Sequence, residues 1–178
     1  SRKMIAKAAA NPAVEGEETA YPGTCRDLGL PPEPPYGARI RLPGEVVTFH
    51  DDLLGPQEQV PRLQCGDLLA RDARGWWSYQ FAVTVDDLRQ GVTFVVRGED
   101  ILSSTGRQIL LGRLLGRETP PRWLHHPIIR TAEGVKLSKR DGATGLRELR
   151  AAGATPAEVI GQAAHAPGLL AEPRPVEA

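Results

Sequence analysis

Cysteine is scarce in this chain: Cys25 and Cys65 are the only two among 178 residues. Two cysteines so far apart do not make a disulfide framework, and a reducing cytoplasm is the expected setting. Long apolar runs are also missing, since no stretch approaches the roughly 18 residues of a membrane-spanning helix. The first 20 residues start basic and turn acidic without an apolar segment, so they lack the pattern of a signal peptide.

Neither sign of charge dominates, because 22 Lys and Arg residues balance 22 Asp and Glu residues. A zero net charge argues against a general nucleic-acid coat protein. The positive charge is nevertheless concentrated: residues 97–150 hold 11 basic and 6 acidic side chains, whereas both flanking segments are net acidic. Charged faces of surface helices explain such a pattern as well as a binding surface does.

The N-terminal part shows no internal repeat and only short predicted elements. Residues 1–10 predict a helix that ends at Asn11-Pro12, and a loop rich in Pro and Gly follows. Residues 38–55 predict two short strands around Pro43-Gly44. The segment after them predicts a strand pair around a turn at residues 72–75.

The middle of the chain alternates between strands and helices. We expect a strand at residues 79–85, a short helix from Asp86, a strand at residues 92–98 and a helix at about residues 105–115. Thr105 is placed to cap that last helix, with Gln108 completing a capping box. Apolar strands that alternate with helices predict an α/β fold with a parallel sheet.

The C-terminal part predicts a strand from Arg122, followed by a turn and a loop, and then two short helices. The first helix covers residues 144–152. The second is opened by Thr155-Pro156, with Glu158 in its first turn. The closing sequence AEPRPVEA predicts a loose tail.

The sequence VKLSKRDG, residues 135–142, gathers three cations, Lys136, Lys139 and Arg140, around a serine. A loop with two lysines can place compact point charges on a polyphosphate, and backbone N–H groups near Gly142 can add hydrogen bonds. Taken alone, an exposed basic turn is the commoner explanation of such a run.

Neighbouring blocks change this balance. SYQFAVTVDD, VVRGEDILSSTGRQILLGRLL and HHPII precede KLSKRDG in that order. Together they resemble the second half of the catalytic domain of glutamyl-type class I aminoacyl-tRNA synthetases, in which KLSKR is a variant of the KMSKS loop. The resemblance covers residues 65–143 closely. It implies an α/β fold that forms the C-terminal half of a Rossmann-like nucleotide-binding domain.

The resemblance also implies how the chain is divided. Residues 1–64 correspond to part of a zinc- and acceptor-binding type of insertion with short β-strands. Residues 65–143 correspond to the second half of the catalytic domain. Residues 144–178 form a short helical segment in place of an anticodon-binding domain.

Two branches of this family fit these blocks. Discriminating glutamyl-tRNA synthetases carry a large anticodon-binding region after the KMSKS loop. The shorter glutamyl-queuosine tRNA(Asp) synthetases lack it and attach glutamate to the queuosine base of tRNA(Asp). Only 38 residues follow Arg140, which favours the second branch. The resemblance then implies glutamate, ATP with Mg²⁺, and queuosine-bearing tRNA(Asp) as partners, with glutamyl-adenylate as the activated form.

The family pattern is incomplete in this sequence. A HIGH-type ATP-binding loop is missing, and so is a Cys-x-Cys pair that would come just before residues 1–3. We therefore expect the C-terminal part of a split, truncated or proteolysed ligase, with a separate N-terminal half to supply the HIGH-type loop. A shortened glutamyl-tRNA synthetase and a non-catalytic tRNA- or nucleotide-binding remnant stay open as alternatives.

The resemblance assigns glutamate binding to Tyr79 and Arg97. A phenol at a strand end offers a rigid donor to a carboxylate, although a tyrosine at the edge of the core is an ordinary alternative. Arg97 follows the apolar strand VTFVV, at the carboxyl end where α/β sheets bind ligands, and a guanidinium can clamp a carboxylate. An ion pair of Arg97 with Glu99 or Asp100 is the competing explanation.

The same resemblance makes Lys139 the catalytic, ATP-binding lysine, because a mobile cation can stabilise charge that builds on the α-phosphate and pyrophosphate. Lys136 is a second phosphate-binding candidate. Ile128 and Ile129 belong to a strand that lines the adenine pocket in such enzymes.

Other polar and aromatic side chains have weaker claims. His125 and His126 lack metal-ligand spacing to other residues, so we expect a structural role for both. Trp76 and Trp77 have the ring area to stack on a base, but they follow a turn, where packing or edge exposure is commoner.

The segment YPGTC resembles the second half of the family's zinc site, which implies Tyr21 and Cys25 as Zn²⁺ ligands. Two residues supply half of the four ligands of a tetrahedral structural site. A plain thiol explains Cys25 equally well, and Cys65 is expected to be a packing residue.

Overall fold

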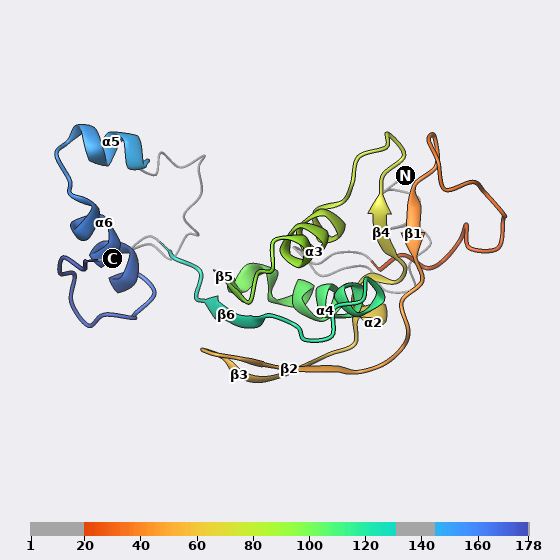
Figure 1. Ribbon diagram of the computed structural model, residues 1–178, viewed down its shortest axis with the longest axis horizontal. Coiled ribbons are helices and arrows are strands. Elements are labelled where there is room, and N and C mark those ends of the chain that lie inside the picture. Colours follow the sequence, from red (N-terminus) through yellow and green to blue (C-terminus); the bar gives the residue numbers. More distant parts are fainter. Residues whose placement is uncertain (1–19, 131–144, 178) are drawn as a thin grey trace. The chain divides into compact units, whose positions relative to one another are not determined.

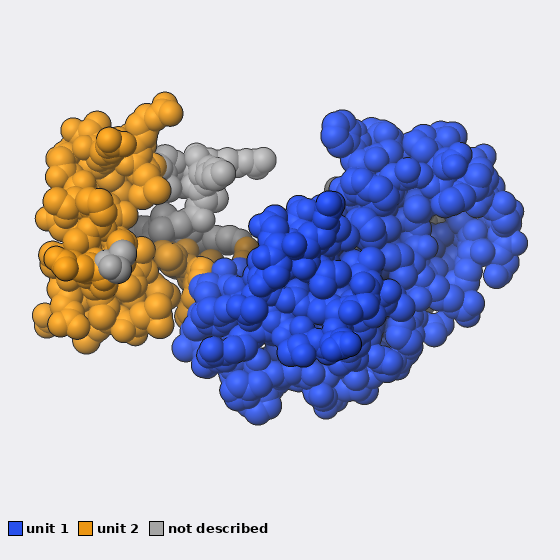
Figure 2. Space-filling view, viewed as in Figure 1, with its two compact units in different colours: residues 1–97, 101–125 blue, residues 98–100, 126–178 orange. Residues whose placement is uncertain are grey.

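A computed structural model describes residues 20–130 and 145–177. The chain divides into two compact units, residues 1–97 with 101–125 and residues 98–100 with 126–178 (Figure 2). The predicted helix at residues 1–10 and the basic loop at residues 135–142 lie outside the described residues. Of the helices in the described part, none is long and apolar enough to cross a membrane.

The larger of the two sheets has four strands in the order β3-β2-β6-β5. Its strands are β2 (Val47–Asp51), β3 (Gly55–Gln59), β5 (Phe94–Gly98) and β6 (Arg122–His126). β2 and β3 form an antiparallel hairpin, whereas β2 runs parallel to β6. The α/β class is as predicted, but the expected parallel sheet is mixed, because the short turn after Asp51 returns the chain alongside β2.

Helix α4 (Thr105–Leu114) lies between this sheet and helix α3 (Tyr79–Arg89) (Figure 1). It is buried along most of its length, and Ile109 and Leu110 meet Val47 and Trp123 in one core cluster. The predicted helix is confirmed.

The predicted capping box at Thr105 is wrong. The chain enters α4 from a preceding helical turn, η1 (Glu99–Ser104), so Ser104 occupies the N-cap position in a helical conformation without a side-chain cap bond. Thr105 is fully buried, and its hydroxyl bonds to side chains of the sheet instead of to the helix backbone.

A second, smaller sheet pairs β1 (Ala38–Ile40) with β4 (Leu68–Arg71). The predicted strand pair at the 72–75 turn shrinks to β4 and a single bridge between Arg71 and Trp77. Helix α2 (Pro61–Cys65), which the sequence did not predict, leads into β4. Cys65 is 4% exposed and packs with Leu42, Leu68 and Leu111, so its predicted packing role is confirmed.

Residues 79–85, predicted as a strand, form the first two turns of helix α3 (Tyr79–Arg89). Ser78 caps this helix, because its Oγ accepts a hydrogen bond from the backbone N–H of Phe81 at 3.2 Å. The apolar run suggested a strand. Phe81, Val85 and Leu88, however, recur at helical spacing and are half-buried. The backbone N–H of Ser78 also donates to the carbonyl of Ala70 at 2.8 Å, which ties the start of α3 to β4.

The second unit contains two predicted helices, α5 (Leu146–Ala151) and α6 (Pro156–His165). Thr155 and Glu158 form a reciprocal capping box at the start of α6. The predicted loose tail is wrong. Val176 N–H donates to the Ala157 carbonyl at 2.9 Å, and a Cβ added to Gly161 would lie 1.7 Å from the carbonyl oxygen of Arg174. The glycine lets the tail pack directly on the helix.

Candidate functional site

Arg97 lies near the carboxyl end of β5, as the sequence predicted, and is half-buried. Its Nε donates to Nε2 of His125 at 2.9 Å, its Nη1 to Oε1 of Gln108 at 2.8 Å and its Nη2 to Oγ1 of Thr105 at 2.7 Å. The guanidinium also lies over the ring of Trp123, 4.8 Å from the centroid. These contacts hold a cation in one orientation at the strand end.

Tyr79, the first residue of α3, places its hydroxyl near the Arg97 guanidinium. Burial lowers the pKa of Arg97, and the nearby Tyr79 hydroxyl opposes that shift through a side-chain hydrogen bond. Tyr79 is 56% exposed, so this part of the site is open to solvent. The structure therefore brings the two predicted glutamate-binding residues together, with Tyr79 at a helix start where the sequence predicted a strand end.

Behind Arg97, His125 and Asp51 form a fully buried pair. Nδ1 of His125 lies 2.6 Å from Oδ2 of Asp51, and the backbone N–H of His125 donates to the same carboxylate. Burial tends to raise the pKa of Asp51, but hydrogen bonds from His125 and from the backbone N–H groups of Leu53 and Leu54 hold it below its usual value. Asp51 is therefore an ionised acceptor inside the core.

On the other side of Arg97, a chain of amide hydrogen bonds joins three helical segments. Nε2 of Gln108 in α4 donates to Oε1 of Gln80 in α3 at 2.7 Å. Nε2 of Gln80 donates in turn to Oγ of Ser104 in η1 at 2.7 Å. The position of Arg97 is thus coupled to the packing of α3 against α4.

Sequence reasoning missed most of this network. His125 was expected to be structural, which agrees with its full burial. Its partner Asp51 and the roles of Thr105, Gln108 and Gln80 around Arg97 were not identified. A signal was available for Asp51, because it ends the run VVTFHD in the same way that Arg97 ends the run VTFVVR.

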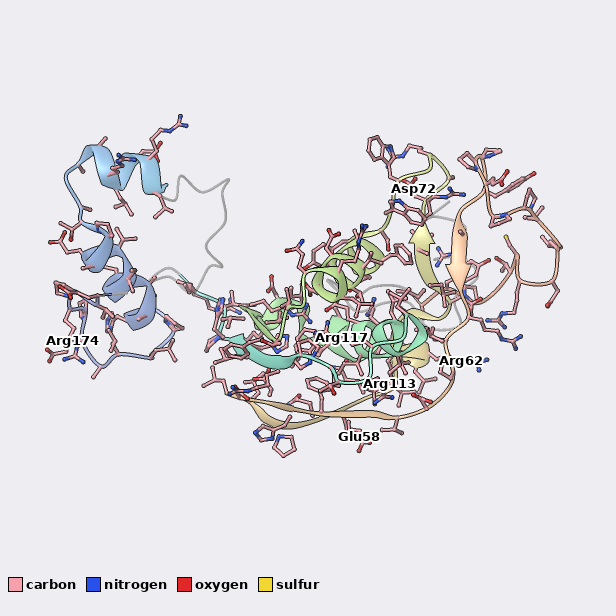
Figure 3. The ribbon with its side chains drawn as sticks, viewed as in Figure 1. Glu58, Arg62, Asp72, Arg113, Arg117 and Arg174 are labelled. Carbon is pink, nitrogen blue, oxygen red and sulfur yellow. The ribbon has the colours of Figure 1, made fainter. Side chains whose placement is uncertain are left out.

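Trp76 and Trp77 follow the turn in which Asp72 accepts backbone N–H groups of Arg74 and Trp76 (Asp72 is labelled in Figure 3). The two tryptophans are 70% and 57% exposed. Trp77 stacks on Phe81 with ring centroids 4.7 Å apart. The predicted edge exposure is confirmed for both residues.

Tyr21 and Cys25 lie close together. The Tyr21 hydroxyl accepts the backbone N–H of Cys25 at 2.8 Å, and hydrogen bonding to Tyr21, with help from Thr24, lowers the pKa of the exposed Cys25 thiol. Across residues 20–130 and 145–177, no group of three or more His, Cys, Asp or Glu side chains is placed to hold a metal ion. The pair alone therefore does not fit a tetrahedral zinc site.

The predicted ATP-binding residues are only partly described. Ile128 and Ile129 are half-buried, and Ile128 N–H donates to Oε1 of Glu99 at 3.2 Å. Glu99, offered as an ion-pair partner for Arg97, is thus engaged with the backbone. Lys136 and Lys139 lie outside the described residues.

Known proteins resemble this chain over most of its length. A protein named glutamyl-Q tRNA(Asp) synthetase from Geobacter sulfurreducens is 50% identical over 147 residues, covering 82% of this chain and 46% of its own length. Proteins of the same name from Bordetella bronchiseptica and Symbiobacterium thermophilum are 51% and 42% identical, and the matches cover 82% and 98% of this chain. The chain spans about half the length of the curated relatives it matches.

A solved structure has a similar fold. The crystal structure of a glutamate tRNA ligase from Elizabethkingia meningosepticum, in complex with its amino acid, superposes with a TM-score of 0.60 at 27% identity. The match covers 79% of this chain and 30% of that one. The family described as tRNA synthetases class I (E and Q), catalytic domain, matches residues 27–163. The chain belongs to this family of class I tRNA synthetases.

Proposed function

We propose that this chain carries the C-terminal part of the catalytic site of a ligase that activates glutamate with ATP and transfers it to the queuosine base of tRNA(Asp). The observation that carries the proposal is the fixed guanidinium of Arg97 beside the phenol of Tyr79 at the end of β5. A cation with N–H donors next to a hydroxyl suits a carboxylate of glutamate. The family match and the names of the relatives support this chemistry.

In the first step, a carboxylate oxygen of glutamate attacks the α-phosphorus of ATP. A new O–P bond forms, the bond from that phosphorus to the bridging oxygen of the β-phosphate breaks, and pyrophosphate leaves. In the second step, a nucleophilic group of the queuosine base attacks the carbonyl carbon of the adenylate and displaces AMP. Both steps depend on positioning and charge stabilisation, and neither assigns a general base to this chain.

The roles of this chain follow from that scheme. Arg97 and Tyr79 bind and orient glutamate. Lys139, with Lys136 as a second cation, stabilises charge on the phosphates, and Ile128 and Ile129 contact the adenine. Mg²⁺ bound with ATP supplies further neutralisation of the phosphate charge.

Tyr21 and Cys25 stay a prediction as zinc ligands. They provide two of the four donors that a structural Zn²⁺ takes, so zinc binding needs two further ligands from beyond the described residues. We derive no step of the reaction from zinc. We also propose a cytoplasmic location, which suits the two free thiols.

The decisive experiment is glutamate-dependent exchange between ATP and pyrophosphate by the intact protein, with and without tRNA. We expect exchange without tRNA, followed by transfer of labelled glutamate to tRNA(Asp) that contains queuosine and not to tRNA(Asp) that lacks it. Exchange that required tRNA would favour the discriminating glutamyl-tRNA synthetases, and absence of exchange under both conditions would refute the ligase proposal.

A further inference from the structure

We propose that Asp51 and His125 are positioning residues that fix the guanidinium of Arg97 and, through it, the amino-acid site. The inference rests on the proposed function only where it assigns Arg97 to glutamate. The protonation of the two ring nitrogens of His125, which the hydrogen bonds to Asp51 and Arg97 determine, can be tested without any substrate.

The hydrogen-bond partners of His125 determine its tautomer. An ionised carboxylate only accepts hydrogen bonds, so Nδ1 of His125, 2.6 Å from Oδ2 of Asp51, carries the proton. Nε of Arg97 only donates, so Nε2 of His125, 2.9 Å away, is the unprotonated acceptor. The imidazole is therefore neutral, with its proton on Nδ1. It links the Asp51 carboxylate to the Arg97 guanidinium through one hydrogen bond on each ring nitrogen.

Asp51 is itself held by the backbone. Its Oδ1 accepts the N–H groups of Leu53 at 3.1 Å and Leu54 at 2.9 Å in the turn between β2 and β3. Its backbone pairs with Trp123 across the parallel β2–β6 ladder, two residues before His125. The hairpin therefore fixes the carboxylate, the carboxylate fixes the imidazole, and the imidazole fixes Arg97.

This arrangement matters because an arginine side chain is long and loses much rotamer freedom when it is ordered. Three of the five N–H groups of Arg97 bond to His125, Thr105 and Gln108. Each terminal nitrogen has one further N–H beyond these three bonds, and the Tyr79 hydroxyl also interacts with Arg97. An Arg97 held this way presents its donors to a carboxylate without a further ordering cost on binding.

The first test is the tautomer itself. In the intact protein labelled with ¹⁵N-histidine, long-range ¹H–¹⁵N correlation spectra near neutral pH should show His125 with a protonated Nδ1 and an unprotonated Nε2. The variant His125→Asn identifies the resonance by removing it. A protonated Nε2 would overturn the proposal whether or not Arg97 binds glutamate.

The second test uses a matched pair of variants in the exchange assay. In His125→Gln the amide oxygen can take the place of Nε2 and accept from Arg97. In His125→Asn the shorter amide replaces Nδ1 and leaves Arg97 without that acceptor. We expect kcat/KM for glutamate to fall about 10- to 100-fold in His125→Asn and to recover substantially in His125→Gln, with the KM for ATP changed by less than about twofold.

An exposed neighbour serves as the control. His50→Asn alters the residue directly before Asp51 and should leave the glutamate KM unchanged. Asp51→Asn should resemble His125→Asn, and the thermal midpoint of each variant shows whether it is folded. Equal losses for His125→Gln and His125→Asn, or parallel changes in the KM for ATP, would indicate a purely structural role and overturn the proposal. If Arg97→Lys itself leaves the glutamate KM unchanged, the proposed function fails, while the NMR result still decides the geometry.

Discussion

Nη2 of Arg97 donates a 2.7 Å hydrogen bond to Oγ1 of Thr105, a threonine that is fully buried in the first turn of α4. A residue from a core helix therefore completes the environment of a cation that comes from a strand end. Because a guanidinium is costly to bury without acceptors, the stability of the core and the geometry of the site depend on the same contact.

Replacing Thr105 by valine should reveal this dependence. Thr105→Val keeps the shape of the side chain but removes the acceptor, so we expect the free energy of unfolding to fall by about 1.5–3 kcal/mol. Thr105→Ser keeps the hydroxyl and should cost less. Urea unfolding of the two variants provides the comparison, and equal losses would mean that the methyl group matters more than the hydrogen bond.

Arg97→Lys tests the role of the fork of N–H donors. A lysine keeps the charge but cannot bond to His125, Thr105 and Gln108 at once. We expect kcat/KM for glutamate in the exchange assay on the intact protein to fall by about 100-fold or more. The control is Arg89→Lys, an exposed change at the end of α3 that should have no effect.

The depressed pKa of Asp51 predicts a defined pH dependence of stability. A carboxyl group whose pKa is lower in the folded protein stabilises the fold above its unfolded pKa, near 3.8, and loses that contribution as pH falls through the folded value. The stability difference between the unaltered protein and Asp51→Asn should therefore be largest above about pH 5 and shrink below the unfolded pKa. Urea unfolding between pH 3 and pH 7 measures it, and a difference that grew on acidification would contradict the assignment.

Gly161→Ala should detach the C-terminal tail from α6. The new methyl group would collide with the Arg174 carbonyl, which lies 1.7 Å from its ideal position. We expect faster hydrogen exchange at the Val176 N–H, which now bonds to the Ala157 carbonyl. Gln162→Ala, an exposed change one residue along, is the control and should leave that exchange rate unaltered.

The two thiols should differ sharply in reactivity. Cys25 is exposed and has a lowered pKa, whereas Cys65 is 4% exposed, so iodoacetamide should alkylate Cys25 first near neutral pH. Tyr21→Phe removes the hydrogen bond that lowers the pKa and should move the pH profile of the reaction upward. Mass spectrometry of the labelled peptides identifies the site, and an unchanged profile in Tyr21→Phe would exclude the phenol as the cause.

Local patterns predicted much of the fold. The strand that contains Arg97, the helix that begins at Thr105 and the capped helix at Thr155 follow from apolar periodicity and cap chemistry, which act over a few residues. The α/β class followed from the same signals. The antiparallel β3 and short α2 gave no comparable pattern, since β3 has the sequence GPQEQ.

The site was less predictable because its members meet only through tertiary structure. Tyr79 was found by resemblance but placed on a strand, since a β-branched run follows it; in the structure Ser78 caps a helix that begins at Tyr79. Asp51 and His125 are 74 residues apart and become partners only when β2 and β6 align. Periodicity within a segment contains no information about such pairing.

The start of α3 has a consequence for how this region tolerates change. The position of Tyr79 is fixed by contacts of the two residues before it with β4. Ser78 N–H donates to the Ala70 carbonyl, and Trp77 forms a β-bridge with Arg71. The turn at residues 72–75 takes part in neither of these two contacts. Its length and composition can therefore vary, as an exposed hairpin tip generally can, while the phenol keeps its place beside the guanidinium.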